Sequence, residues 1–582
     1  MAFQISPGVN VSEVDLTTVV PAVSSTTGAF AGVFNKGPIG EAILIDSEVT
    51  LVERFGKPTA DNFESFFTVA NFLSYAGACY VVRIDNGATK ASNISAPFIA
   101  KNAGIDGDSL EVVTVGDGVG EFSSTGTLTE FLIDISTSRT TASYDNTTSA
   151  LTIQDGDILE IGDYTLEIDT VSGATITFKN KYTGFANLGD GGASALTTVT
   201  RYWGGYKAIN VAPNAGRFHI VVRDTNGLIL ETFNNVSPTS TDKNVDGTSA
   251  YYKTVVDNGS SWVTTEGAQG SNILVSTGAR AIYGFSSGGA GTDEATTGVS
   301  AYAAGYDLFK DADALDISLI LLGKANTTLA QYVVDNIAEH RKDCVAMISP
   351  TYNATVDEMI TFRDAIGSSS YAMMDSGYKY QYDKYSDVYR WVPLNGDVAG
   401  LCARTDNDRD PWFSPAGYNR GLIKNTVKLS INPNKAQRDK LYASGINPVI
   451  TEAGQGTLLF GDKTLLSTPS AFDRINVRRL FIVLEKAVAR ASKTTLFEFN
   501  DEFTRAQFKN LIEPFLRDVQ GRRGIYDFKV VADETNNSAE VVDGNRFVGD
   551  IYIKPAKSIN FIQLNFVAVR SGVEFEEIVG QF

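Results

Sequence analysis

The chain offers few side chains that could act as a nucleophile, a general base or a metal ligand. It has two histidines, His219 and His340, and three cysteines. His340 and Cys344 stand four residues apart, so a Cys/His nucleophile pair is one interpretation. We expect a break between them because Cys344 begins a predicted strand, which favours a surface histidine at a helix end. Cys79 and Cys402 have apolar or small neighbours and are expected to be small buried hydrophobes.

Several glycine- and aspartate-rich segments match phosphate or calcium loops only in part. The run at 116–120 lies in a strand-rich region rather than between a strand and a helix, so it predicts a turn. The acidic stretches at 106–108 and 155–157 lack the pattern of a calcium loop and its final Glu, and are expected to be hairpin turns. No segment has metal-ligand spacing. We therefore assign no catalytic, cofactor-binding or metal-binding residue and predict that the chain is not an enzyme.

One charged pattern has a functional interpretation, and it belongs to a helix predicted from Asp473 to Ala491. At about 100° per residue, its apolar side chains fill one arc and basic side chains gather on a separate arc. This pattern indicates either an ordinary solvated face or a face that docks onto an acidic partner. The basic residues are Arg474, Arg478, Arg479, Lys486, Arg490 and Lys493.

The charge of the chain is distributed unevenly. The net charge is -19 over 582 residues, but residues 421–582 carry 22 basic and 19 acidic side chains. The acidic bulk of residues 1–420 excludes a general nucleic-acid binder, which needs a basic footprint. No run of about 18 apolar residues exists, so no membrane insertion is expected. The N-terminus lacks the basic and apolar regions of a signal peptide, which predicts assembly in a cytoplasm.

The elements that would position these residues fall into two kinds of segment, one that mixes strands and helices and one that is rich in strands. Strands and helices alternate from residue 28 to 84, which indicates an α/β arrangement. A stretch rich in Thr, Ser, Gly and Asp follows and predicts short strands with no convincing helix. The α/β pattern returns between 301 and 420, with helices predicted around 329–340 and 356–366. Helices near 436–442, 473–491 and 501–519 then precede strands from Tyr526 onward.

Both ends of the chain read as strands without partners. Residues 7–14 are extended and alternating, and 559–569 and 573–576 form two further strand-like runs. Termini usually fray unless they are tied down, so alternating ends are candidates for donation to the sheet edge of a neighbour. Two such ends on one chain indicate a polymer. The candidate linking residues are Val9, Val11, Glu13, Val14, Phe561, Gln563, Asn565, Val567, Val569, Val573 and Phe575.

The order of several short motifs resembles the tail sheath proteins of contractile-tailed bacteriophages. The resemblance covers both ends and most of the middle, but not the strand-rich stretch from about 90 to 205. No single motif is decisive, whereas their order along the whole chain is quite specific. The motifs are Pro-Gly-Val-x-Val-x-Glu at 7–13, Gly-x-Phe-x-Gly at 28–32, Lys-Gly-Pro at 36–38, Gly-Arg-Phe at 216–218, the aromatic-Pro-Ala stretch at 411–417, Gly-Asp-Lys-Thr-Leu at 461–465 and Asn-Val-Arg-Arg at 476–479.

The resemblance implies a structural homopolymer of the phage virion. Six-fold rings would stack helically around a tail tube protein, bounded by baseplate and tail terminator proteins, and contraction would drive the tube through the host envelope. The basic helix would then face the tube. The sheath of another contractile injection particle, such as a phage-tail-like bacteriocin or a secretion system, is the alternative. A non-contractile virion protein or adhesin is less favoured, because helices flank the strand-rich stretch on both sides.

The same resemblance implies a domain organisation of mixed α/β and all-β parts. A linker arm at 1–25 precedes a discontinuous α/β and β sheath core. The remaining parts are an inserted, outward-facing β domain, a subtilisin-like α/β domain without protease activity, and a tube-facing α+β domain that ends in a linker strand. The predicted ranges are 26–89 with 206–300 for the core, 90–205 for the insertion, 301–420 for the subtilisin-like domain and 421–582 for the C-terminal domain.

Overall fold

The computed structural model describes residues 25–559, apart from 76, 117–122, 134–140, 148, 150, 152, 154–155, 162–163, 180–195, 203–212, 227 and 269–279. It divides into two compact units, which we describe separately. Unit 1 takes the chain up to Phe30, Thr68–Tyr80 and Phe309 onward, and unit 2 takes Ala31–Phe67 and Val81–Leu308. Strands β1 (Gly28–Gly32) and β3 (Cys79–Arg83) and helix α2 (Phe63–Leu73) each contribute residues to both units.

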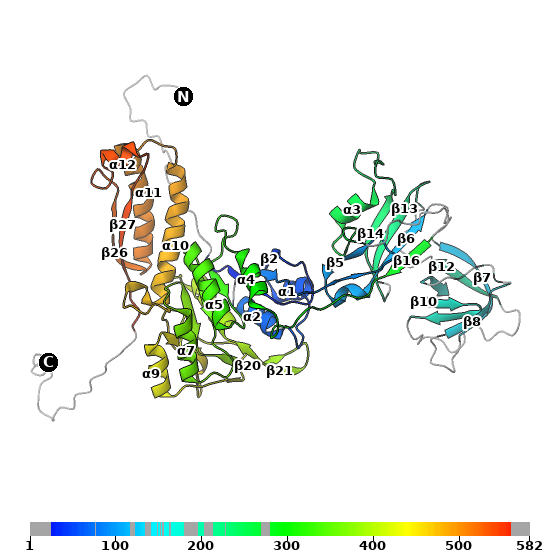
Figure 1. Cartoon of the computed structure of the whole chain (residues 1–582), viewed down its shortest axis with the longest axis horizontal. Helices are drawn as coiled ribbons and strands as arrows, with labels where there is room; N and C mark the ends of the chain where they lie inside the picture. The colour runs from blue at the N-terminus through cyan, green and yellow to red at the C-terminus, as the bar shows by residue number, and fades with distance from the viewer. Residues whose placement is uncertain are drawn as a thin grey trace, which may run out of the picture. The chain divides into compact units, whose positions relative to one another are not determined.

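A parallel sheet forms the centre of unit 1. Its strands run in the order β1, β17 (Leu319–Leu321), β18 (Val345–Ile348), β19 (Ala372–Asp375) and β23 (Ile446–Asn447). Strands β17, β18 and β19 are buried along their whole length, as expected where both faces of a parallel sheet are covered. Helices of the same unit include α5 (Thr327–Val333), α7 (Val356–Ile366) and α8 (Asn395–Asp408) (Figure 1).

The helices of this part follow their local sequence signals. The predicted helix at 356–366 has those bounds, because Thr355 and Glu358 form a reciprocal capping box at its start. The predicted helix at 329–340 is interrupted: α5 continues through a π-helical turn at Val334–Ala338 into α6 (Glu339–Arg341). Lys342 then adopts a left-handed conformation and ends the helix before β18.

Two small antiparallel sheets and one helix complete the middle of unit 1. Strands β20 (Tyr378–Asp383), β21 (Val388–Pro393) and β22 (Lys428–Leu429) form one sheet. Strands β24 (Val449–Glu452) and β25 (Gly456–Leu459) form the other, and α9 (Lys435–Ala443) lies before them in sequence. Strands β22 and β23 pair with strands of the 301–420 region, so strand pairing crosses residue 421, and the domain boundary expected there stays a prediction. Helix α10 (Ile475–Ser492) begins the last group of elements, the C-terminal module.

The C-terminal module packs two long helices against a two-stranded sheet. Helix α10 and helix α11 (Glu502–Gly521) lie beside β26 (Ile525–Val531) and β27 (Asp550–Pro555), with the short α12 (Ala539–Asp543) between the strands in sequence (Figure 1). Apolar side chains from the helices and strands meet in one core. Its buried members are Trp412, Leu480, Leu484, Phe508, Ile512, Leu516, Val519, Ile525, Val530 and Ala532.

Unit 2 begins with elements whose caps are readable from the sequence. Strand β2 (Ala42–Ile45) leads into α1 (Glu48–Phe55). The Ser47 hydroxyl accepts a hydrogen bond from the Thr50 amide at 3.2 Å, and Gly56 ends the helix with a φ of 83°, as predicted. A four-stranded sheet follows in the order β14 (Ile229–Val236), β13 (Phe218–Asp224), β6 (Leu110–Gly116) and β16 (Arg280–Gly284).

A second sheet and a helix cover the apolar face of this sheet. Strands β15 (Val263–Thr264), β5 (Ile99–Ala103) and β4 (Lys90–Ser92) form the second sheet, and the helix is α3 (Tyr252–Gly259). The acidic stretch at 106–108 lies in a 3-10 helix, η1 (Ile105–Ser109). The predicted hairpin turn is wrong there, because the flanking strands β5 and β6 enter different sheets and do not pair.

The strand-rich stretch contains a closed six-stranded barrel. Its strands are β7 (Ser123–Ile133), β8 (Thr141–Asp145), β9 (Ile158–Ile161), β10 (Tyr164–Ser172), β11 (Thr175–Phe178) and β12 (Leu196–Tyr202), in the order β10-β11-β8-β7-β12-β9. The barrel lies within the range 90–205 expected for the insertion, whose bounds stay a prediction. Strands β5 and β6 fall in the same range and pair with the later strands β15, β13 and β16. The expected mixture of α/β and β parts is confirmed. Among the described residues, no helix combines the length and apolar character that a membrane span requires.

Candidate functional site: the C-terminal sheet and helix α10

The groups considered for nucleophilic chemistry do not form a reactive pair. His340 is exposed on α6, whereas Cys344 is fully buried. Burial raises the pKa of the Cys344 thiol to about 12 and that of Cys402 to about 11, and it raises the pKa of Cys79 beyond its ordinary range. Nδ1 of His219 accepts a hydrogen bond from a backbone amide, at 2.9 Å. The thiols of the three cysteines are therefore protonated at neutral pH, and a protonated thiol is a poor nucleophile.

Several titratable side chains of unit 1 form a buried polar network. The Lys379 ammonium and the Tyr75 hydroxyl donate to one carboxylate oxygen of Asp397, at 2.8 and 2.9 Å. The Ser349 hydroxyl donates to Asp375 at 2.6 Å, and Asp375 is 1% exposed. Because Lys379 and Asp397 are also completely buried, a substrate has no access to these groups. The network joins β19, β20 and α8 and has a structural role in packing.

The potential metal ligands of the described residues are not gathered into a metal site. No group of three or more His, Cys, Asp or Glu side chains in the described residues is arranged to hold a metal ion. Asp157, from the acidic stretch at 155–157, instead pairs with Arg201 at 2.6 Å inside the barrel, where both side chains are almost fully buried. The stretch at 116–120 lies outside the described residues apart from Gly116, which ends β6.

The sheet of the C-terminal module has two open edges. Strands β26 and β27 pair with each other in an antiparallel register from Ile525–Pro555 to Val531–Asp550, and neither has another strand partner among the described residues. The register shifts between Ile525 and Asp527. Phe528 and Ile553 pack against the core shared with α10 and α11, whereas Tyr526 and Tyr552 are 65% and 61% exposed. An isolated pair of strands is marginal in water, and each open edge presents backbone donors and acceptors to another strand.

The predicted linking strands cannot be placed on these edges. They fall within 1–24 and 560–582, outside the described residues, so their donation to a neighbour stays a prediction. The residues concerned are Val9, Val11, Glu13, Val14, Phe561, Gln563, Asn565, Val567, Val569, Val573 and Phe575.

The predicted basic residues lie on helix α10 or directly beside it, but most of them form ion pairs or ring contacts with other residues of the chain. Arg479 is 3% exposed and forms an ion pair with Asp406, while its guanidinium also donates to the carbonyl oxygen of Cys402 at 3.4 Å. The Arg478 guanidinium is stacked over Tyr371 and Phe472, 4.3 and 3.9 Å from the ring centroids. Neither residue belongs to a solvated face.

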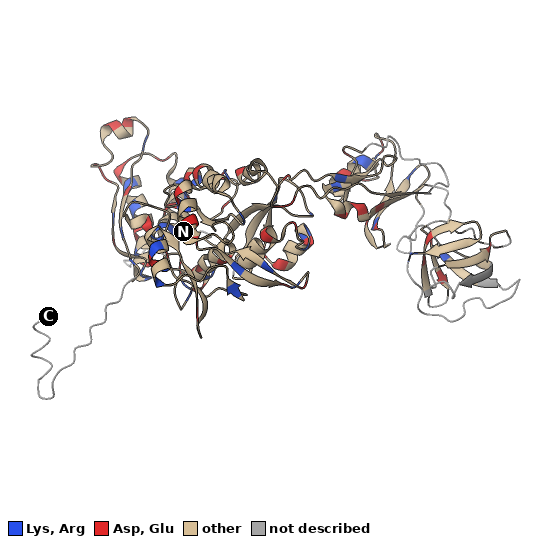
Figure 2. Ribbon diagram, turned by 60° about the horizontal axis from the view of Figure 1, so that its bottom comes forward, with Lys and Arg blue, Asp and Glu red and all other residues tan. Residues whose placement is uncertain are grey.

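The C-terminal half of α10 is tied to the segment before β17. The Lys486 ammonium donates to Asp316 at 2.9 Å and to the carbonyl oxygen of Ile317 at 2.6 Å, and Arg490 pairs with Asp316 at 3.0 Å. Burial alone would raise the pKa of the Asp316 carboxyl, but the hydrogen bonds and charges of Lys486 and Arg490 outweigh it and lower that pKa. Figure 2 shows the positions of basic and acidic residues interspersed along the ribbon.

The ends of the basic set differ in accessibility. Arg474 pairs with Asp462 at 2.9 Å and is 23% exposed in its side chain. Arg490 is 42% exposed and Lys493 is 70% exposed, and the distance from Lys493 to Asp313 is 3.9 Å. An exposed pair at that distance contributes little to stability, so Lys493 keeps most of its charge available to a partner. Contact of this helix with a tube remains a prediction. The sequence wheel missed the pairs of Arg479, Lys486, Arg490 and Lys493 because their acidic partners lie 73 to 180 residues away in the chain.

Family models match the second half of the chain. The model described as phage tail sheath protein central domain matches residues 316–465. The model described as phage tail sheath C-terminal domain matches residues 467–568. The boundary between these two matches lies close to the start of α10.

Curated relatives align over almost the whole chain. The tail sheath protein of Vibrio phage KVP40 is 34% identical, with 99% of this chain and 100% of that protein covered. The tail sheath protein of Enterobacteria phage T4 is also 34% identical, with 99% of each chain covered. The crystal structure of a sheath tail protein from Listeria innocua shares the fold, with a TM-score of 0.54, 11% identity and coverage of 92% of this chain and 93% of that one.

Proposed function

The chain belongs to the family of phage tail sheath proteins, and from this premise we propose that it polymerises around a tail tube as the contractile sheath of a phage tail. Contraction from a metastable extended state would drive the tube through the host cell envelope during genome delivery. The named relatives are structural tail proteins, which implies a non-enzymatic role in the virion. In this proposal the polymer assembles in the host cytoplasm and contacts the tube, the baseplate and the tail terminator.

The observation that carries this proposal is the two-stranded sheet with two open edges. Strands β26 and β27 are backed by the core of α10 and α11 on one face, so the acceptor site is rigid. The chain also has two alternating segments, one toward each terminus, that would supply one strand to each edge. A four-stranded sheet made from several copies would satisfy the backbone groups that the two-stranded sheet leaves open.

Donated strands would hold neighbouring copies together during contraction. Several main-chain hydrogen bonds would form along each added strand and would hold neighbouring copies together while their domains rotate. The donated strands would be residues 9–14 and 561–569, and Val573 and Phe575 would continue the C-terminal link beyond the donated strand. Sheath assembly would therefore depend on the strand character of both segments.

The energy of contraction would be stored in the contacts between copies. An extended lattice would exchange one set of contacts for another of lower free energy. A difference of a few kcal/mol per copy is sufficient, because it is summed over a long cooperative array. No nucleotide needs to be hydrolysed in such a mechanism.

Helix α10 would support tube contact differently from the sequence interpretation. Its buried cations fix the helix to the sheet of unit 1, and Arg490 and Lys493 are the cations left most accessible to an acidic tube surface. The barrel would face outward, since closure leaves it without a sheet edge for joining copies. The region at 301–420 would keep a subtilisin-like fold without protease activity.

The proposal is tested by removing each linking segment from the full chain. Deleting residues 1–14, or the residues after Gly572, should leave a folded monomer that no longer forms tubular polymers. A matched control keeps the length of the chain but replaces 573–576 with Gly-Ser-Gly-Ser, which removes strand propensity alone and should also abolish polymers. Negative-stain electron microscopy and circular dichroism are the measurements. Normal tubes from either truncated chain would contradict strand donation as the basis of assembly.

A further inference from the structure

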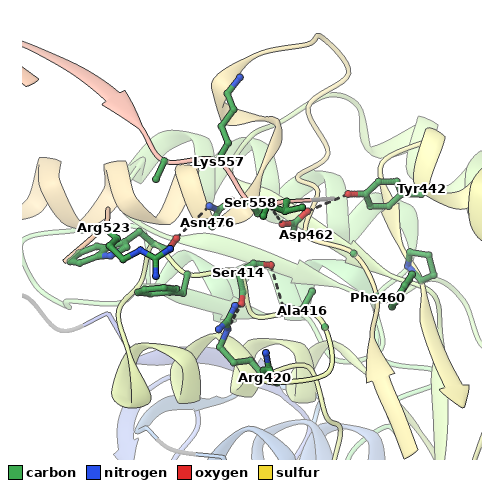
Figure 3. A pocket seen from close by; sticks show the side chains of 18 of the residues that line it. Ser414, Ala416, Arg420, Tyr442, Phe460, Asp462, Asn476, Arg523, Lys557 and Ser558 are labelled. Atoms are coloured by element: carbon green, nitrogen blue, oxygen red, sulfur yellow. Dashed lines mark hydrogen bonds between the residues drawn. The ribbon is translucent and has the colours of Figure 1, made fainter. Parts of the chain in front are cut away.

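Unit 1 contains a cleft that the proposed strand exchange does not use. Its volume is about 1000 Å³, and it lies between the loop after α8, helix α9 and the ends of β26 and β27 (Figure 3). Aromatic side chains form much of its lining, including Trp412, Phe413, Phe460 and Tyr526. Phe460 is 42% exposed and Tyr526 is 65% exposed, so part of this apolar surface is open to an occupant.

The lining of the cleft is strongly basic. It includes Arg420, Lys435, Arg438, Arg523 and Lys557, against the two acids Asp439 and Asp462. Asp462 is already paired with Arg474 and accepts a hydrogen bond from Ser558 at 2.9 Å.

None of the five cations forms an ion pair with another described residue. Arg420 donates to the carbonyl oxygen of Ser414, and Arg438 lies over the Phe460 ring at 5.6 Å. The cleft therefore offers uncompensated positive charge beside aromatic surface.

We propose that this cleft binds residues 573–582 of a second copy of the chain. That segment, Val-Glu-Phe-Glu-Glu-Ile-Val-Gly-Gln-Phe, has three glutamates, two phenylalanines and no lysine or arginine. Its composition is complementary to a cleft of cations and aromatic rings. The inference rests on the proposed function, because only a chain that donates its C-terminal strand to a neighbour would bring this segment to that neighbour's cleft.

The position of the cleft fits the proposed strand exchange. Its lining includes Ile525 and Tyr526, where β26 begins, and Ala556 and Lys557, which follow β27. A donated strand at 561–569 that runs antiparallel to β26 would end beside the cleft, and residues 573–582 would enter it. The N-terminal segment 1–24 is the weaker occupant, since it has two acids, Glu13 and Asp15, in more than twice the length.

The test uses cysteine cross-linking between full-length chains. The native cysteines are all buried, so introduced surface cysteines react selectively. Mixing a K435C chain with an E576C chain under mild oxidation should give a disulfide-linked dimer on a non-reducing gel. The matched control is N545C, at an exposed turn outside the cleft. Its cross-linking yield with E576C should be at least roughly fivefold lower than that of K435C, because no binding raises the local concentration of the two thiols.

Charge exchange tests the chemistry of recognition. With K435C kept, R438E and R523E together should reduce the cross-link roughly tenfold, and E574K with E577K on the E576C chain should restore it. The loss should be smaller at high salt, where screening is stronger. An unchanged yield after charge reversal would overturn the proposal.

Three further outcomes would also overturn it. The first is that E576C cross-links equally well to N545C and to K435C. The second is that a K435C/E576C double variant, diluted with unmodified protein, forms the cross-link only within one chain. The third is that K435C cross-links to S12C in place of E576C. Electron microscopy of the unoxidised samples separates this inference from the proposed function. Tubes without the K435C–E576C link would contradict only the cleft, whereas absence of tubes would count against sheath assembly itself.

Discussion

Individual buried charges define the residue scale of this protein, and Asp375 is the clearest case. Its carboxyl is enclosed at the end of β19, where burial raises its pKa to about 8, even though the Ser349 hydroxyl and the Gly377 amide donate to it. The Asp397 carboxylate nearby raises the pKa further. Asp375 is therefore largely protonated in the folded protein near neutral pH, unlike an ordinary aspartate of pKa about 3.9.

This arrangement predicts that stability falls with rising pH between the unfolded-state and folded-state pKa values of Asp375. Because the folded-state pKa of Asp375 lies above the unfolded value, the folded state binds its proton more tightly, and the free energy of unfolding falls as the pH rises from about 4 to 8. The slope for one such group is at most about 1.4 kcal/mol per pH unit. D375N cannot ionise, so its melting temperature relative to the unsubstituted protein should rise between pH 6 and pH 9.

Scanning calorimetry of the two proteins at both pH values measures this difference. D387N, at an exposed aspartate in the turn between β20 and β21, is the control and should follow the unsubstituted protein at both values. If the difference between D375N and the unsubstituted protein is the same at pH 6 and pH 9, Asp375 is not the titrating group.

At the scale of elements, helix α10 shows how a basic pattern can serve the chain's own packing. Its cations pair with acidic groups on other elements of the same unit: Arg479 is buried against Asp406, and Lys486 contacts Asp316 and Asp343. A charge buried without its partner is costly, whereas an exposed pair contributes little. The orientation of α10 therefore depends on its least exposed cation, Arg479.

We predict that R479M destabilises the protein by roughly 3 to 5 kcal/mol, because it leaves the Asp406 carboxylate buried without a counter-charge. R479M combined with D406L should recover much of that loss, since no buried charge then remains. K493M, at the exposed end of the same helix, is the matched control and should change stability by less than about 1 kcal/mol. Urea unfolding followed by tryptophan fluorescence reports on the change, because Trp412 lies in the adjoining core. A double variant no more stable than R479M would argue against the ion pair.

At the scale of the whole molecule, the barrel is a separable insertion. Its core residues form their own cluster, distinct from that of the sheets formed by β4–β6 and β13–β16. The chain leaves at Gly116 and returns at Phe218, and these two residues are directly opposite each other in the antiparallel pairing of β6 and β13. A short turn could therefore replace the barrel without moving either strand.

We predict that replacing residues 117–217 with a short Asn-Gly turn leaves the rest of the chain folded and able to form tubes. Limited proteolysis and negative-stain microscopy check this, with the full chain as reference. A matched replacement of 117–235, which also removes β13 and nearly all of β14, should abolish folding of unit 2 because two of the four strands of the β14-β13-β6-β16 sheet are lost. Loss of tubes from the first variant alone would mean that the barrel takes part in assembly.

The sequence by itself determined the family, the mixture of α/β and β parts and several element boundaries. These depend on local chemistry: Ser47 and Gly56 bound α1, and Thr355 with Glu358 starts α7, because caps act within one helical turn. The alternating ends are equally visible in the sequence, although their partners stay a prediction. The basic set on α10 was identified as residues but not as contacts.

Only the tertiary structure decided which acidic groups pair with the cations of α10 and which distant strands pair with each other. Asp406 and Asp316 are far from α10 in sequence, so no periodicity could reveal that they pair with Arg479 and Lys486. The strand pairings that cross the predicted limits of the insertion and of the C-terminal domain were hidden for a related reason. Strands β4–β6 and β22–β23 find their partners in other regions of the chain, and hydrogen bonding between distant strands leaves no signal in the local pattern. Folding, which brings distant segments together, settled both questions.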